Sequence, residues 1–206
     1  MYKEILSTKQ QELLPLLQAF KREFYLVGGT AIALHIGHRR SIDFDLFKKG
    51  NLNIKRILSK ISQLNHSYIV TRRVEEQLNL IMNDVKITFF DYPYPVEANC
   101  KFGDIIKIPD LLQLSAMKAF ALGRRSKWKD YIDLYYILKE HYSVNEIVCS
   151  ADSIFGQLFS EKLFRAQLSY FEDIDYSEPV ESLREEISPV DVKEFLIAKA
   201  IDLREE

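Results

Sequence analysis

Two short segments of the sequence carry residue types able to hold a phosphate and a metal ion. Gly28-Gly29-Thr30 ends a short apolar run, and Asp43-Phe44-Asp45 follows after one short helical block. Glycines let a backbone approach a bulky anion, and the helix that follows directs its NH groups at that anion. Carboxylates at i and i+2 of a strand share a face about 7 Å apart, a spacing suited to hard cations. Together they predict a phosphate cradle beside a Mg²⁺ site, as nucleotidyl transfer requires.

Each motif alone has a plainer interpretation. A Gly-Gly pair at the end of a strand is usually only a turn, and alternating aspartates on a strand usually form a solvated face. Their order, with a single short helix between them, favours the functional interpretation, which the structural context must confirm.

A second set of charged residues lies in the C-terminal half. Lys118 sits on one expected helix and Asp130 opens the next, after a loop that begins at Gly123. Two antiparallel helices would present both side chains to one cleft, with Lys118 binding the triphosphate as a point charge. Asp130 would act as general base on the acceptor hydroxyl or complete the charge set around the metals. In the alternative interpretation, Asp130 and Asp133 complement the helix dipole and Lys118 packs over the core.

Basic and aromatic residues near these segments are further candidates for contacts to nucleotide or RNA. Arg40 precedes the acidic segment, and Lys129 belongs to the densest basic cluster, residues 124–129. Arg and Lys side chains of this kind bind triphosphate or RNA phosphates, although surface solvation explains each Arg equally well. Tyr92 and Tyr94 have the ring for stacking on a base, but a tyrosine flanked by proline is more often a packed loop anchor.

Hydrophobic periodicity outlines the elements that must position these residues. The N-terminal half mixes both kinds of element and the C-terminal half is helical, which predicts an α+β protein. The Asn83-Asp84 pair predicts a hairpin turn, and residues 172–188 read as a long loop. The expected strands cover residues 24–27, 41–47, 67–74, 78–82, 85–90 and 105–108, and the expected helices cover 8–21, 30–36, 54–64, 111–122, 128–140, 154–171 and 190–203.

Composition narrows the class of protein. The 206 residues are 47% hydrophobic and 28% charged, which is typical of a packed domain rather than a disordered chain. Lys and Arg number 28 against 30 Asp and Glu, so affinity for nucleic acid requires a local cluster. Cys100 and Cys149 form no metal or disulfide pattern, and neither a signal peptide nor a membrane span is evident. We therefore expect a cytoplasmic protein without a membrane partner.

The motifs resemble those of a known family. The segments Tyr25–Leu34 (YLVGGTAIAL), His38–Phe47 (HRRSIDFDLF) and Lys129–Leu134 (KDYIDL), together with Lys118, look like the AbiEii/AbiGii abortive-infection toxins. These belong to the polymerase-β-like nucleotidyltransferase superfamily, and the resemblance spans residues 25–138. It implies a Mg²⁺-dependent enzyme that transfers a nucleotide from a nucleoside triphosphate to an acceptor. In toxin relatives the acceptor is an RNA such as tRNA, and a cognate antitoxin is the partner.

With the resemblance, the expected fold is a nucleotidyltransferase-type mixed sheet with flanking helices over residues 1–108, and a helical subdomain over 109–206 that closes the cleft. The predicted metal ligands are Asp43 and Asp45, which with Lys118 and Asp130 form the catalytic set. The predicted nucleotide-binding residues are Gly28, Gly29, Thr30, Arg40, Lys118 and Lys129.

One position departs from the superfamily pattern. Many members carry a third carboxylate on a later strand, where this sequence has Thr88. A neutral hydroxyl is a poor Mg²⁺ ligand and a poor base, so this role is absent or is taken by Asp84, Asp91 or Asp130. The departure keeps two alternatives open: a non-catalytic nucleotide-binding or protein-interaction module, and an antibiotic-modifying nucleotidyltransferase, which needs the same metal chemistry.

Overall fold

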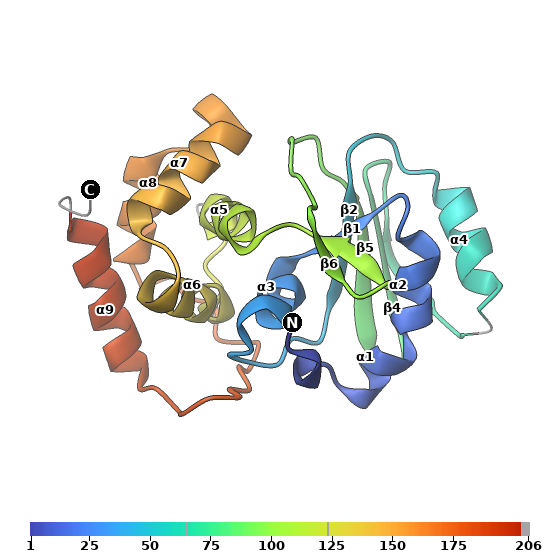
Figure 1. Ribbon diagram of the computed structural model, residues 1–206, viewed down its shortest axis with the longest axis horizontal. Coiled ribbons are helices and arrows are strands. Elements are labelled where there is room, and N and C mark those ends of the chain that lie inside the picture. Colours follow the sequence, from blue (N-terminus) through green and yellow to red (C-terminus); the bar gives the residue numbers. More distant parts are fainter. Residues whose placement is uncertain (65, 123, 203–206) are drawn as a thin grey trace. The chain divides into compact units, whose positions relative to one another are not determined.

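A computed structural model describes residues 1–64, 66–122 and 124–202 of the chain. It divides into two compact units, Met1–Asp110 and Leu111–Glu206. The boundary expected at 108/109 lies two residues before this division. Each unit has its own core and is described by itself below (Figure 1).

The described part of the first unit forms a seven-stranded mixed sheet with the strand order β3-β4-β5-β2-β1-β7-β6. The strands are β1 (Tyr25–Val27), β2 (Phe44–Lys48), β3 (Ile69–Arg73), β4 (Gln77–Met82), β5 (Val85–Asp91), β6 (Cys100–Phe102) and β7 (Ile106–Ile108). The helices are η1 (Lys3–Ile5), α1 (Thr8–Glu12), α2 (Leu14–Phe20), α3 (Gly28–Ile36) and α4 (Ile54–Ser62).

The two faces of this sheet differ in polarity. Strand alternation turns Leu46, Phe89 and their neighbours toward α2 and α4, where they are fully buried; the Phe20 and Phe89 rings, for example, are 4.9 Å apart. The opposite face, here called the polar face, carries two rows of register-paired residues. The acid row contains Val27, Asp45, Thr88, Asn79 and Arg72. The aromatic row contains Lys101, Lys107, Tyr25, Phe47, Phe90 and Gln77.

Strand β3 is an edge of the sheet. All five of its residues are exposed, including Ile69 at 67%, and a register shift between Val70 and Arg72 interrupts its pairing with β4. The hairpin that follows turns at Asn83 and Asp84, both with positive φ, as the sequence predicted.

Two local expectations for the first unit were wrong, and one strand was missed. The N-terminal helix is two helices, because a new helix begins after Leu13 with Pro15 in its first turn. The strand expected from residue 41 begins at Phe44, so Asp43 lies before it. Strand β6 was not expected, because its three residues carry too short a pattern.

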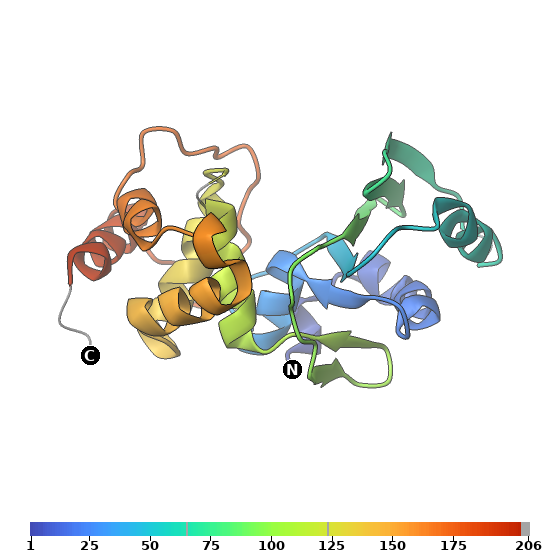
Figure 2. The ribbon, with the colours of Figure 1, turned by 90° about the horizontal axis from the view of Figure 1, so that it is seen from above.

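The helical unit comprises α5 (Leu111–Leu122), α6 (Trp128–Glu140), α7 (Val144–Phe155), η2 (Gly156–Leu158), α8 (Glu161–Leu168) and α9 (Pro189–Ile201). Helix α9 packs against α6 and α8, as Figures 1 and 2 show. The helical stretch expected around 154–171 is not continuous: Gly156 ends α7 at a φ of +53°, and Ser160 caps the next helix. Two residues of the expected elements, Gly123 and Leu203, lie outside the described residues.

No helix within the described part of the chain has both the length and the apolar character that a membrane span requires.

Candidate active site

Gly28 joins β1 to α3 and faces one of the predicted metal ligands. Its φ of +73° lies in the left-handed region, and a Cβ at this position would collide with Oδ2 of Asp45. Both facts require glycine here. Helix α3 begins at Gly28 itself, earlier than Thr30 as expected from the sequence, so the carboxylate of Asp45 lies against the helix N-terminus. The positive end of the helix dipole favours negative charge at this place.

Gly29 has a different reason to be glycine. A Cβ at Gly29 would come within 2.5 Å of Nη2 of Arg39, a residue that is only 3% exposed. The Arg39 Nη1 donates to the carbonyl of Arg40 at 2.9 Å. Gly29 therefore makes room for a buried guanidinium, a role that the predicted phosphate cradle did not include.

Thr30 fixes the backbone segment that leads to Asp43 and Asp45. The residue is 1% exposed; its hydroxyl donates to the carbonyl of Asp43 and lies 2.9 Å from the hydroxyl of Ser41. The side chain of Gln10, also buried, donates to the carbonyl of Ser41 at 2.7 Å. Because the Thr30 hydroxyl is enclosed, a phosphate at this turn would meet backbone NH groups rather than that side chain.

Asp43 and Asp45 are both half-exposed, and their backbone positions are fixed in different ways. Asp45 belongs to β2 and lies in register between Val27 and Thr88, which places it in the acid row of the polar face. Asp43 precedes the strand, so strand alternation does not fix it; the contact of its carbonyl with Thr30 does. Two accessible carboxylates match what Mg²⁺ uses when substrate phosphates supply the remaining ligands.

Among the residues that the structure describes, no third acid lies beside this pair. Thr88, 7% exposed, is the β5 neighbour of Asp45, and no group of three or more His, Cys, Asp or Glu side chains in the described ranges is arranged to hold a metal ion. Asp84 lies at the hairpin turn in an exposed ion pair with Lys9. Asp91 accepts a hydrogen bond from the Gly50 amide at 2.8 Å. Both lie at least three residues along β5 from Thr88, roughly 10 Å, so neither takes the missing position.

In the helical unit, Lys118 and Asp130 form one buried ion-pair cluster. The Lys118 ammonium lies 2.7 Å from Oδ1 of Asp130 and 2.8 Å from Oδ2 of Asp133. Both carboxylates are fully buried, and the lysine side chain is 4% exposed. Arg125 adds a bond from Nε to Oδ2 of Asp130 at 3.0 Å. The cluster ties α5 to α6.

This environment argues against the base role expected of Asp130. Burial raises the pKa of its carboxyl, but the charges of Lys118 and Arg125 outweigh burial and hold that pKa below its usual range. A carboxylate with a lowered pKa and both oxygens in ion pairs is a weak proton acceptor. Binding of the triphosphate by Lys118 stays a prediction, and it would require the ammonium to exchange a carboxylate for a phosphate.

The remaining basic candidates also have partners. Nη1 of Arg40 donates to the carbonyl of Glu4 at 3.1 Å. Lys129 and Lys127 both pair with Glu178, which comes from the loop over 172–188. Burial alone would raise the pKa of Glu178, but hydrogen bonds from the two lysines lower it to about 2. An acid from a distant loop thus neutralises part of the basic cluster, which the spacing along the sequence does not reveal.

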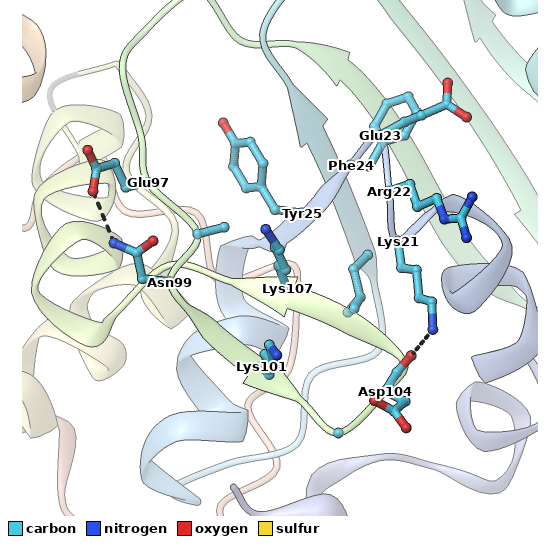
Figure 3. Close-up of a pocket in the computed structure, with 13 residues that line it drawn as sticks. Lys21, Arg22, Glu23, Phe24, Tyr25, Glu97, Asn99, Lys101, Asp104 and Lys107 are labelled. Carbon is cyan, nitrogen blue, oxygen red and sulfur yellow. Dashed lines mark hydrogen bonds between the residues drawn. The ribbon is translucent and has the colours of Figure 1, made fainter.

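A cavity of about 670 Å³ lies on the first unit, lined by residues outside the predicted site (Figure 3). Tyr25, Lys101 and Lys107 of the aromatic row line it. The sequence does contain a signal for one of these residues. Polarity alternates along Ile106-Lys107-Ile108, and burial of both isoleucines turns the Lys107 side chain to the opposite face of the sheet.

Comparison with known proteins defines the class. The fold is similar to that of MenT4, a nucleotidyltransferase toxin of Mycobacterium tuberculosis (TM-score 0.61, 12% identity, covering 94% of this chain and 82% of that one). It is also similar to JHP933 of Helicobacter pylori (TM-score 0.59, 12% identity, 97% and 91% covered). The antibiotic-resistance factor ANT(2″)-Ia gives a TM-score of 0.52 at 12% identity, with 71% and 92% covered. The fold is that of the nucleotidyltransferases.

Sequence comparison is more specific. Residues 16–202 match the model of the family described as nucleotidyl transferase AbiEii toxin, type IV toxin–antitoxin system. An uncharacterized protein of Aquifex aeolicus (strain VF5) is 30% identical over 187 residues, which cover 86% of each chain. The chain belongs to the AbiEii nucleotidyl transferase toxin family and is a nucleotidyltransferase.

Proposed function

We propose that the protein transfers a nucleotide from a nucleoside triphosphate to an RNA acceptor with the help of Mg²⁺, as the toxin of a toxin–antitoxin pair. The observation that carries this proposal is the seating of the Asp45 carboxylate against Gly28, at the N-terminus of α3. At this position, a helix N-terminus that can bind anionic phosphates lies beside a carboxylate that can bind the cation neutralising them.

The residues of the first unit fit such a metal site. Asp43 and Asp45 would hold Mg²⁺, together with oxygens of the triphosphate. When bound, Mg²⁺ would neutralise the triphosphate and stabilise the leaving pyrophosphate. Gly28 lets the backbone come close to the phosphates, and Thr30 keeps Asp43 in place through its backbone. Arg40 and Lys129 remain candidate contacts for the nucleotide or the RNA.

The reaction is a displacement at the α-phosphorus. The acceptor hydroxyl oxygen forms a bond to that phosphorus, the bond to the β-phosphate bridging oxygen breaks, and pyrophosphate leaves. The hydroxyl proton passes to water rather than to Asp130, because both oxygens of that carboxylate are in ion pairs.

Incubation of the purified protein with Mg²⁺, each α-labelled nucleoside triphosphate in turn and total RNA tests the proposal. The unmutated protein should label RNA, and Asp45→Asn should lower the rate at least about 100-fold, because the metal site loses a carboxylate. Asp84→Asn is the matched control: it removes one acid charge from an exposed turn and should keep full activity. Equal activity of the Asp45→Asn and control variants would refute the metal-site assignment.

The pair of carboxylates also predicts how metal and nucleotide bind, since Thr88 stands where many superfamily members have an acid. With only two carboxylates, Mg²⁺ alone should bind weakly, and nucleoside triphosphate with Mg²⁺ should bind clearly. Calorimetry measures both. Loss of this synergy in Asp45→Asn would support the shared site, and its absence in the unmutated protein would count against the site. Binding without transfer, across all nucleotides and RNA, would contradict the proposed transfer.

A further inference from the structure

The cavity at the β1–β7 side of the sheet lies outside the residues assigned above to metal and triphosphate. It has a volume of about 670 Å³, within the usual range for small-ligand sites and large enough for a nucleotide unit. Its walls come from the end of the α2–β1 connection, from β1, and from the segment running through the β6–β7 hairpin. Figure 3 shows Lys107 pointing toward Tyr25, with Lys101 on the neighbouring strand.

Strand register places this cavity on the same face as the acids. Tyr25 pairs with Phe47 on one side and with Lys107 on the other, and Lys107 pairs with Lys101. Paired residues of adjacent strands point to the same side of a sheet. On β1, Tyr25 lies two residues before Val27, the partner of Asp45, which is about 7 Å along the strand. The cavity is therefore next to the acid row.

The charges of the cavity favour an anion. Lys101 and Lys107 are exposed, and within the described residues neither ammonium makes an ion pair or a hydrogen bond. Three acids also line the cavity, against four Lys and Arg residues. Two of the acids are engaged: Glu23 binds Lys60 and Arg56, and Glu97 accepts a hydrogen bond from Asn99 at 3.0 Å. The third is Asp104, whose backbone carbonyl accepts a hydrogen bond from Lys21 at 3.0 Å. Two adjacent ammonium groups over an aromatic wall match the phosphates and sugar-base unit of a nucleic acid strand.

We propose that this cavity binds the single-stranded end of the RNA acceptor, with Lys101 and Lys107 on its phosphates and the Tyr25 ring beside one nucleoside. This inference rests on the proposed function, because the triphosphate is assigned to the Gly28 end of β1. The Tyr25 end of the same strand is then the place from which an acceptor hydroxyl approaches the α-phosphorus. Lys101 and Lys107 supply the local positive charge that a chain of net charge −2 needs for binding RNA.

The test measures binding of a labelled single-stranded RNA of about 12 nucleotides, without nucleoside triphosphate, by fluorescence anisotropy across a salt series. The double variant Lys101→Ala/Lys107→Ala should bind about tenfold more weakly near 0.1 M salt, and the slope of log K against log salt should fall by about 1.4, because two phosphate contacts are lost. Lys101→Arg/Lys107→Arg should restore binding, since arginine keeps the charge.

The matched control is Lys55→Ala/Lys162→Ala, which removes two exposed lysines outside this cavity. Equal RNA affinity and salt slope in the cavity and control variants would overturn the inference, as would an unmutated protein that binds no RNA. In the transfer assay, the cavity variant should raise the KM for RNA and leave the KM for nucleoside triphosphate unchanged.

The two proposals fail in distinguishable ways. If the unmutated protein transfers nucleotides but Lys101 and Lys107 do not affect RNA binding, the cavity assignment is wrong and the proposed function stands. If RNA binding depends on these lysines but no nucleotide is transferred, the RNA site stands and the proposed function fails.

Discussion

The two carboxylate pairs of this protein differ in what surrounds them. Asp43 and Asp45 are half-exposed beside a helix N-terminus, whereas Asp130 and Asp133 are fully buried around the ammonium of Lys118. The buried pair has its counter-charge inside the fold, which is the usual arrangement for a buried acid. The half-exposed pair is accessible to solvent, as the proposed metal site requires. The same residue type thus fits the proposed ligand site in one place and forms a structural ion-pair cluster in the other.

The largest effect should follow from breaking the buried cluster. Lys118→Ala leaves two buried carboxylates without their main counter-charge and should lower the free energy of unfolding by about 3–5 kcal/mol. Urea unfolding followed by Trp128 fluorescence measures this, because Trp128 is the only tryptophan in the sequence and begins α6. Lys162→Ala, on an exposed face, is the control and should change little. A loss below about 1 kcal/mol in Lys118→Ala would show that the cluster contributes little to stability.

A smaller effect should follow at the half-exposed pair. Gly28→Ala combines an unfavourable φ with a collision at Asp45 and should cost about 2–3 kcal/mol. Gly103→Ala is the control, because its φ is +54° but nothing lies within 4 Å of the added Cβ, so it should cost only about 1 kcal/mol. Scanning calorimetry compares the two variants. Equal losses would mean that Asp45 moves aside without cost.

Adding the missing acid sharpens the comparison. Thr88→Asp places a third carboxylate next to Asp45 on a residue that is 7% exposed, so without metal it should cost about 1–2 kcal/mol. Millimolar Mg²⁺ should recover much of that loss, because a cation relieves the repulsion. Thermal unfolding in EDTA and in Mg²⁺ measures both values. The unmutated protein is the control, and an equal response to Mg²⁺ in both would place Thr88 outside the metal site.

The smallest effect concerns Glu178, an acid paired with lysines near the surface. Its pKa in the folded protein is about 2, below the ordinary 4.5, so its stabilising effect is complete above pH 4.5 and is lost as the pH falls toward 2. The side chain is 38% exposed, which limits the effect to less than about 1 kcal/mol. The difference in unfolding free energy between the unmutated protein and Glu178→Gln should shrink across this range. A difference that grows on acidification would contradict the assignment.

Local pattern predicted much of the fold. The bounds of α5 and α6 agree with the expected 111–122 and 128–140, because each is a long segment rich in apolar residues, and Pro109 before the first helix and Gly123 between the two mark their ends in the sequence. The helix expected over 154–171 fails, since a single glycine in a left-handed conformation breaks a pattern that hydrophobicity alone continues. The start of α3 at Gly28 was missed for a similar reason: the sequence shows that glycine permits an unusual φ, but not where the helix begins.

The site was predictable to the extent that it depends on neighbours along the chain. The proximity of Gly28 to the acidic segment followed from one short connection, and the nearness of Lys118 to Asp130 followed from two consecutive helices. Contacts over long separations were not accessible. The burial of Arg39 beside Gly29 and the pairing of Glu178 with Lys129 depend on how loops fold back, which periodicity does not encode.

The exposed edge strand β3 has a consequence for the solution behaviour of the protein. A row of backbone groups flanked by Ile69 and Val70 is a template on which a second chain can add a strand. Arg72 and Arg73 place two positive charges on this edge, and the register shift after Val70 bends it away from flat pairing. Charge repulsion and local curvature therefore both oppose the pairing of this edge with a second sheet.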